Sequence, residues 1–155
     1  MGNLRDKVNK FVKEQLCNYQ PIHVRAPKVI HDSILGSNLF LPYEIAVLDL
    51  PIIQRLRRIS QVAVASFVYP SGNHNRFEHT LGVAVIGEKL VDSLYRKIDE
   101  GKLSNLYQNV KLERNFVCEH VRMAAILHDC GHGPFSHVSE KVYKNFDDIK
   151  ETSYI

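Results

Sequence analysis

The chain has 155 residues, of which 45% are hydrophobic and 24% charged, and its formal net charge is +3. This length and hydrophobic content suit one folded domain and exclude a disordered tail or a fibrous protein. The slight net charge, with basic and acidic residues interspersed along the chain, disfavours nucleic acid as a partner.

The cysteines and the apolar stretches predict a soluble, cytoplasmic protein. Three cysteines, Cys17, Cys118 and Cys130, form no CxxC pair, and an odd number cannot all pair within one chain, which favours a reducing compartment. The longest apolar stretch, residues 45–53, contains an aspartate and a proline and is far too short to span a membrane. We therefore expect no membrane association.

The first half of the chain predicts helices around a small β-hairpin. Apolar residues recur every three to four positions over residues 3–17, which is typical of an amphipathic helix. β-Favouring pieces on either side of Gly36-Ser37-Asn38 predict a hairpin within residues 28–42. Two prolines then suit the first turns of two helices, which we expect over residues 43–48 and 52–61.

The second half predicts an exposed connection followed by longer helices. Residues 62–74 are rich in turn-forming residues and should form an exposed loop. Residues 76–98 carry apolar positions at helical spacing and should form the longest helix. Helical periodicity resumes over residues 116–128, and Pro134 begins a further helix that runs to about Phe146. The expected fold class is all-α, with a helical core and a minor β-hairpin near the amino terminus.

Eight histidines, six of them in two short stretches, point to chemistry. One stretch, residues 74–79, opens the long helix, and the other lies between residues 120 and 137. Adjacent His128 and Asp129 at a helix end can face one cation, with His79 of the opposing helix as a third ligand. Imidazole and carboxylate ligands together suit Mn, Fe or Zn and disfavour Ca. A single histidine is more often a hydrogen-bonded core or surface residue, so the clustering carries this hypothesis.

Two motifs are longer and more specific: His-Asn-Arg-Phe-Glu-His-Thr-Leu-Gly at 74–82 and His-Asp-Cys-Gly-His-Gly-Pro-Phe-Ser-His at 128–137. With shorter motifs in the same order, they resemble the HD-domain deoxynucleoside triphosphate triphosphohydrolases, especially the sterile-alpha-motif-associated and bacterial branches. The resemblance covers roughly residues 28–145 and omits the amino-terminal helix. The shorter motifs are Asp32–Gly36, Asp49–Pro51, Gln54–Arg57, Gln61 and Tyr69-Pro70.

The resemblance implies a metal-dependent phosphohydrolase with an HD-domain fold. It assigns His79, His128 and Asp129 as three of four metal ligands, with Mg accompanying the nucleotide. The family's fourth ligand is an aspartate on a later helix, beyond position 155, so we expect residues 1–155 to form a single partial HD domain and an amino-terminal fragment. A helical piece of a larger domain should expose apolar surface and self-associate.

The resemblance also implies roles around the substrate. It places His132 and His137 beside the phosphates, with Glu140 orienting the catalytic histidine. An imidazolium there can protonate a leaving oxygen while a metal neutralises the phosphate. Arg76 shares a helical face with His79 and is expected to bind a phosphate, with a salt bridge to a neighbouring carboxylate as the alternative.

Gln61 resembles the family's sugar-reading glutamine, whose amide bonds the 3'-hydroxyl. Val62 stands where the family crowds the 2' position, which favours a deoxynucleotide. The alternative is that Gln61 merely caps its helix.

A regulatory nucleotide is a further implication. Asp49, Gln54 and Arg57 match positions that bind an activating guanine nucleotide at a subunit boundary in some family members, which implies a homo-oligomer. His31 departs from the asparagine of those members, and Asp49 before a proline also suits a helix amino terminus. We interpret the basic cluster at residues 55–58 as a solvated helix face, with anion binding as the alternative.

Three functions stay open from the sequence. The first is hydrolysis of deoxynucleoside triphosphates to deoxynucleoside and triphosphate. The second keeps the metal and histidines but acts on another substrate, as a nucleotidase or phosphodiesterase of the HD superfamily. The third is a catalytically silent nucleotide-binding or assembly module, which the missing fourth ligand favours.

Overall fold

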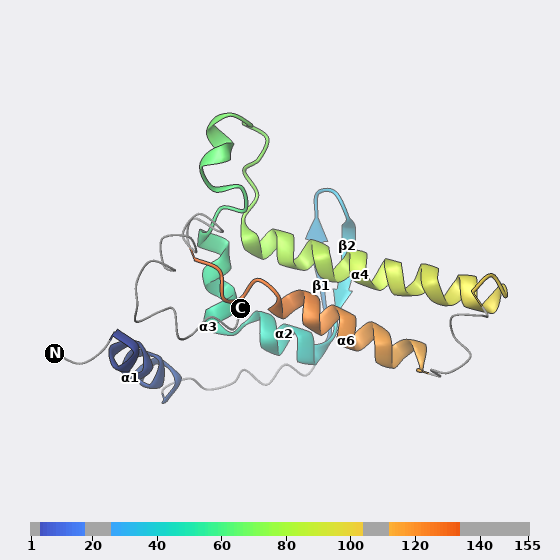
Figure 1. Ribbon diagram of the computed structural model, residues 1–155, viewed down its shortest axis with the longest axis horizontal. Helices are drawn as coiled ribbons and strands as arrows, with labels where there is room; N and C mark the ends of the chain where they lie inside the picture. The colour runs from blue at the N-terminus through green and yellow to red at the C-terminus, as the bar shows by residue number, and fades with distance from the viewer. Residues whose placement is uncertain (1–3, 18–25, 104–111, 134–155) are drawn as a thin grey trace.

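The computed structural model describes residues 4–17, 26–103 and 112–133 of the chain (Figure 1). Helices dominate these residues, and the two strands form one antiparallel sheet, which confirms the expected all-α class with a minor hairpin. The elements in chain order are α1 Leu4–Cys17, β1 Lys28–Asp32, β2 Gly36–Phe40, α2 Pro42–Leu48, α3 Pro51–Gln54, the 3₁₀ helices η1 Arg55–Arg58 and η2 Ala63–Phe67, α4 Arg76–Asp99 and α6 Arg114–Leu127.

The hairpin forms where the sequence predicts it. β1 and β2 pair from Lys28 opposite Phe40 to Asp32 opposite Gly36. In the turn, Asp32 Oδ1 accepts the backbone N–H groups of Leu35 and Ile34 at 2.7 Å each, and these two bonds lower the pKa of Asp32. Gly36 has a φ of +76°, which L side chains rarely adopt. The hairpin therefore has a defined turn, and it leads into the buried Phe40.

The predicted helix over residues 52–61 is only partly correct. Its proline start is confirmed, but α3 changes to the 3₁₀ helix η1 at Arg55, and Ile59 is extended, with φ −113° and ψ 117°. The extended backbone lets Ile59 O accept the N–H of Arg76 at 2.8 Å, and Gln61 N donates to His74 O at 3.1 Å. Pairing with the start of α4 thus overrides the helical pattern in the last turn.

Helices α4 and α6 lie side by side and antiparallel (Figure 1). Their orientation is visible in two ion pairs: Arg114 joins Asp92 late in α4, and Arg76 at the start of α4 joins Asp129 just after α6. α4 is the longest helix of the described residues, as predicted. Gly87 allows close approach, since a Cβ there would lie 2.9 Å from Val121 Cγ1.

One core joins these helices to the hairpin. Its buried apolar side chains come from β2, α2, α3, η1, α4 and α6, and partly buried residues such as Ile30 and Leu35 of the hairpin pack against it. The fully buried or nearly buried members are Phe40, Ile45, Leu48, Ile53, Leu56, Ile59, Phe77, Leu81, Ala84, Val85, Ala125 and Ile126. This core holds the amino-terminal end of α4 beside the carboxy-terminal end of α6.

Apolar side chains also remain on the surface of the described residues. The predicted exposed connection contains η2, where Phe67 is 88% exposed, and α4 exposes Ile86 and Leu90 on its outer face. α1 likewise exposes Val8 and Phe11. Uncovered apolar surface was expected, whereas self-association stays a prediction.

Two further sequence expectations concern membranes and the later residues. Among residues 4–17, 26–103 and 112–133, none of the helices combines the length and the apolar character that crossing a bilayer requires. The helix expected from Pro134 to Phe146 lies outside the described residues.

Candidate metal centre

The three predicted metal ligands lie together where α4 begins and α6 ends. His79 is in the first turn of α4, His128 is the C-cap residue of α6, and Asp129 follows it. One potential ligand atom from each of the three residues lies within 4.8 Å of the other two. The imidazole rings of His79 and His128 have centroids 5.4 Å apart and planes inclined by 60°. The structure therefore brings together the groups that the sequence singled out.

Asp129 is the centre of this cluster. Its side chain is buried, with 4% of the residue exposed. Oδ2 lies 2.5 Å from Arg76 Nη1 and 3.7 Å from His79 Nε2. Oδ1 lies 3.3 Å from His128 Nε2 and 3.2 Å from His132 Nε2. A buried carboxylate thus faces one guanidinium and three imidazoles.

His128 is oriented by the helix that it ends. Its Nδ1 lies 2.6 Å from the backbone oxygen of Ala125, one turn back. With the Nδ1–H donated to that carbonyl, Nε2 keeps its lone pair and points toward Asp129. Two backbone bonds, from Cys130 N to Leu127 O and from His132 N to Asp129 O, both 3.1 Å, form the turn that follows. This tight turn brings the side chains of His128 and Asp129 to the same side of the chain, next to His79.

His79 lies in the first turn of α4, and a capping box holds the start of this helix. Asn75 Oδ1 accepts Glu78 N at 2.9 Å, and Glu78 Oε2 accepts Asn75 N at 3.1 Å, which is a capping box. Burial lowers the pKa of His79, and the nearby charge of Asp129 acts in the opposite direction. Neutral imidazole is the form that ligates a metal, so burial favours the ligand form.

Arg76 forms a salt bridge to a neighbouring carboxylate, which was the alternative to a phosphate contact in the sequence analysis. Its side chain is buried, with 2% of the residue exposed, and Nη1 donates to Asp129 Oδ2. In this structure Arg76 therefore holds the carboxylate of Asp129, and a contact with substrate phosphate stays a prediction.

Gln61 does not cap a helix. η1 ends at Arg58, and the buried Gln61 Oε1 has no hydrogen-bond partner among the described residues. Val62 packs closely against Gly72 of the following loop. A Cβ added at Gly72 would lie only 2.9 Å from Val62 Cγ2. Ala63 has a φ of +48°, in the left-handed region that an alanine rarely occupies. The sugar-reading roles of Gln61 and Val62 stay predictions.

Of the three residues predicted for nucleotide activation, Gln54 and Arg57 contact each other, and Asp49 pairs with Lys28 instead. Asp49 is the C-cap residue of α2 and lies 3.7 Å from Lys28 Nζ, so its interpretation as a helix amino-terminal residue is wrong. Gln54 Nε2 donates to the backbone oxygen of Leu48 at 2.7 Å, and Gln54 Oε1 accepts from Arg57 Nε at 2.8 Å.

The basic cluster at residues 55–58 is not one solvated face. Arg55 Nη2 donates to the backbone oxygen of Cys130 at 2.5 Å, although the two residues are 75 positions apart. The guanidinium carbon of Arg57 lies 3.7 Å from the centroid of the Phe77 ring. The solvated-face interpretation is therefore wrong for Arg55, and nothing in the sequence beyond its basic neighbours indicated this contact.

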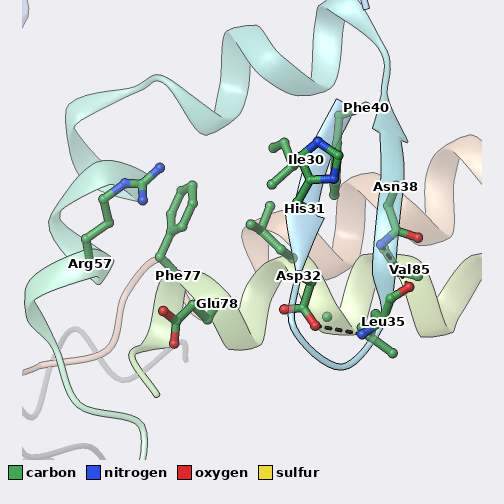
Figure 2. A pocket seen from close by; sticks show the side chains of 12 residues that line it. Ile30, His31, Asp32, Leu35, Asn38, Phe40, Arg57, Phe77, Glu78 and Val85 are labelled. Atoms are coloured by element: carbon green, nitrogen blue, oxygen red, sulfur yellow. Dashed lines mark hydrogen bonds between the residues drawn. The ribbon is translucent and has the colours of Figure 1, made fainter. Parts of the chain in front are cut away.

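A cavity of about 190 Å³ lies between the hairpin and α4 (Figure 2). Arg57 and Phe77 line it on one side, and the hairpin residues Asp32 and Asn38 line it on another. His31 also lines the cavity, and its Nδ1 lies 2.7 Å from Ser37 Oγ. The cavity combines an aromatic ring with charged and amide groups, which suits a polar aromatic ligand.

His137 and Glu140, the remaining predicted catalytic residues, lie outside the described residues. His132 lies within them, beside Asp129. The described part of the candidate site is therefore the ligand cluster with Arg76 and His132.

Comparison with known proteins identifies the family of this chain. The HD domain family model matches residues 76–154, and the chain belongs to this family. The chain is 42% identical over 117 residues to the deoxynucleoside triphosphate triphosphohydrolase SAMHD1 of Homo sapiens, covering 76% of this chain and 17% of that protein. It is 37% identical over 116 residues to the SAMHD1 homolog of Dictyostelium discoideum, covering 75% of this chain and 21% of that one.

A similar match reaches an archaeal protein. The uncharacterized protein MJ1154 of Methanocaldococcus jannaschii is 37% identical over 113 residues, covering 73% of this chain and 21% of that protein. The chain thus spans about a fifth or less of the length of these three relatives.

Proposed function

We propose that this chain provides the metal-dependent site that hydrolyses deoxynucleoside triphosphates to deoxynucleoside and triphosphate. The observation that carries the proposal is the convergence of His79, His128 and Asp129 within 4.8 Å of one another. Membership of the HD domain family supports a phosphohydrolase site. The substrate class comes from relatives named deoxynucleoside triphosphate triphosphohydrolases.

The donor set fits a divalent transition metal. Two imidazole nitrogens and a carboxylate oxygen suit Mn, Fe or Zn, and Mg would arrive with the nucleotide. A bound metal would neutralise phosphate charge and lower the pKa of a coordinated water. The contact of His128 Nδ1 with the backbone oxygen of Ala125 supports this role, because it leaves Nε2 available to a metal.

Proton transfer is assigned to the histidines beyond the ligand pair. In the proposed reaction a water oxygen joins the α-phosphorus, the bond from phosphorus to the 5'-oxygen breaks, and that oxygen takes a proton. His132 or His137 would donate this proton, and Glu140 would orient the donor. The position of His132 Nε2, 3.2 Å from Asp129 Oδ1, supports a place beside the metal.

Arg76 and Gln61 are proposed to hold the substrate. Arg76 lies against Asp129, so its guanidinium is close to where a metal-bound phosphate would sit. The buried Oε1 of Gln61 needs a donor, and a sugar 3'-hydroxyl would supply one. Val62 would then crowd the 2' position and disfavour a ribonucleotide.

An activating guanine nucleotide is proposed for the cavity between the hairpin and α4. Arg57, which lines this cavity beside Phe77, supports contact with a phosphate there, and the carboxylates of Asp32 and Glu78 in the same lining support contact with N–H groups of a base (Figure 2). Asp49 and Gln54 are proposed to contribute from the same part of the fold, in a homo-oligomer.

Free thiols at the three cysteines agree with a reducing, cytoplasmic location.

The test combines metal analysis with turnover. Purified protein should contain or take up Mn, Fe or Zn, and should release deoxyadenosine and triphosphate from dATP faster than it hydrolyses ATP. Asp129→Asn should abolish turnover. His120→Ala is the matched control, because His120 is exposed on α6 and bonds only to the backbone of its own helix among the described residues.

The other outcomes identify the competing functions. Nucleotide binding without metal or turnover would favour a silent binding module. Equal turnover of dATP and ATP would favour a broader HD nucleotidase.

A further inference from the structure

The segment of residues 55–61, here called the bridging segment, contacts both elements that carry metal ligands. On one side it is bound to the start of α4 by backbone hydrogen bonds. Arg76 N donates to Ile59 O at 2.8 Å, Gln61 N donates to His74 O at 3.1 Å, and Ser60 pairs with Asn75 in an isolated bridge. These contacts lie three to five residues before His79.

On its other side the bridging segment reaches the turn after α6 through one side chain. Arg55 Nη2 donates to Cys130 O at 2.5 Å, and Cys130 follows the ligand Asp129 directly. The last carbonyl groups of a helix and of the turn after it lack intrahelical partners, and a cation there is favourable. The guanidinium therefore satisfies a backbone acceptor that the turn itself leaves open.

The bridging segment is also fixed to the core. Leu56 and Ile59 are buried in the same apolar cluster as Phe77 and Ile126, which belong to α4 and α6. A shift of the segment would open this packing, and closely packed interiors resist such shifts. One fixed segment thus contacts the α4 end that carries His79 and the α6 turn that carries Asp129.

We infer that Arg55 is a positioning residue, which holds the turn of His128 and Asp129 at the distance from His79 that metal binding requires. The inference rests on the proposed role of these three residues as ligands. Arg55 touches neither metal nor substrate in this scheme. It acts through the backbone of Cys130, which sets the direction of the adjacent Asp129 carboxylate.

The experiment compares metal binding and local order in Arg55 variants. Arg55→Met keeps the apolar stem and removes the donors, Arg55→Gln shortens the polar group, and Arg55→Lys keeps a cation. Arg58→Gln is the control, because Arg58 is the exposed arginine at the end of η1 and no hydrogen bond or ion pair to described residues involves it. Co²⁺ serves as the probe, since its visible absorption reports ligand geometry. Thermal unfolding of each metal-free variant establishes that it is folded.

We expect Arg55→Met and Arg55→Gln to weaken Co²⁺ binding by about tenfold or more, as loss of outer contacts to metal ligands does. Their Co²⁺ absorption bands should shift. In the metal-free proteins, the amide protons of Cys130 and His132 should exchange faster than in the wild type. Arg55→Lys should recover part of the affinity, and Arg58→Gln should match the wild type in every measurement.

The result that overturns the inference alone is wild-type Co²⁺ affinity and unchanged amide exchange in a folded Arg55→Met or Arg55→Gln protein. Either folded variant decides, so failure of one to fold leaves the test intact. A wild-type protein that binds no Co²⁺, Mn²⁺ or Zn²⁺ would instead overturn the proposed function, and this inference with it.

Discussion

Arg122 of α6 and Glu44 of α2 form a two-point ion pair inside the core. Arg122 Nε and Nη2 lie 2.6 and 2.8 Å from Glu44 Oε1 and Oε2, and the residues are 4% and 0% exposed. Nη1 also donates to Glu88 of α4 at 2.5 Å, and Nη2 to the backbone oxygen of Leu39 at 3.0 Å. Burial alone would lower the pKa of Arg122, but its bonds to the two glutamates raise it overall. One guanidinium thus joins β2, α2, α4 and α6.

Arg122→Met should destabilise the protein strongly. The substitution leaves the Glu44 carboxylate buried without its cation, and breaking a buried ion pair typically costs about 3–5 kcal/mol. Urea unfolding should show a midpoint far below that of the wild type.

Two comparisons separate the ion pair from a general loss of packing. The double substitution Arg122→Met with Glu44→Gln should be more stable than Arg122→Met alone, because the one carboxylate left without Arg122 is then that of Glu88, whose side chain is 43% exposed. Arg114→Met removes an exposed partner of Asp92 and should leave the midpoint almost unchanged. Equal losses in all three proteins would contradict a specific role for the buried pair.

Gly87 allows α4 and α6 to approach closely. Alanine favours a helix by about 1 kcal/mol over glycine, yet we expect Gly87→Ala to destabilise the protein, because its Cβ would lie 2.9 Å from Val121 Cγ1. Overpacking in a close-packed interior costs about 1–3 kcal/mol. Chemical unfolding in a double-mutant cycle with Val121→Ala measures the clash, and Gly87→Ala should cost less in that background. A stabilising Gly87→Ala would show that the helices adjust freely.

Periodicity predicted the helices that bury one face against a neighbour. The regular apolar spacing in residues 76–98 and 116–128 corresponds closely to α4 and α6, whose facing sides form the core. The predicted helix over residues 52–61 failed at its end, since Ile59 bonds to the backbone of Arg76. Local spacing contains no information about a backbone partner so distant in the sequence.

In the candidate site, too, the local sequence predicted some residues, whereas others are brought together only by packing. His128 and Asp129 could be predicted because they are adjacent and end an apolar helix, and His79 because it closes a specific motif. The contact of Arg55 with Cys130 was missed, as was the pairing of Arg122 with Glu44, because these pairs form only when elements 75 or more positions apart pack together. Residue type indicates which groups can bind a metal, whereas only packing shows which groups orient them.

Metal should stabilise the folded protein, and the effect should depend on the proposed ligands. At a free Mn²⁺ concentration 100 times Kd, one site raises the free energy of unfolding by about 2.7 kcal/mol. Thermal unfolding should therefore move to higher temperature with Mn²⁺ and return with a chelator. His79→Ala and His128→Ala should lose this shift, while His120→Ala keeps it. A shift that survives both ligand substitutions would place the metal elsewhere.

Recognition of the sugar should depend on Gln61 at the 3'-hydroxyl, which dATP and ATP share, and on Val62 at the 2' position, where they differ. Gln61→Ala removes the buried acceptor, and loss of a hydrogen bond worth about 1.4 kcal/mol would lower kcat/KM for dATP about tenfold. Val62→Ala should instead raise kcat/KM for ATP relative to dATP, because a smaller side chain leaves room for the 2'-hydroxyl. Val64→Ala, at an exposed position of η2, is the control and should leave the ratio unchanged. The kcat/KM values for dATP and for ATP are measured separately in each variant. A dATP preference that survives Val62→Ala would exclude Val62 from selection at the 2' position, and an unchanged kcat/KM for dATP in Gln61→Ala would exclude Gln61 from binding the 3'-hydroxyl.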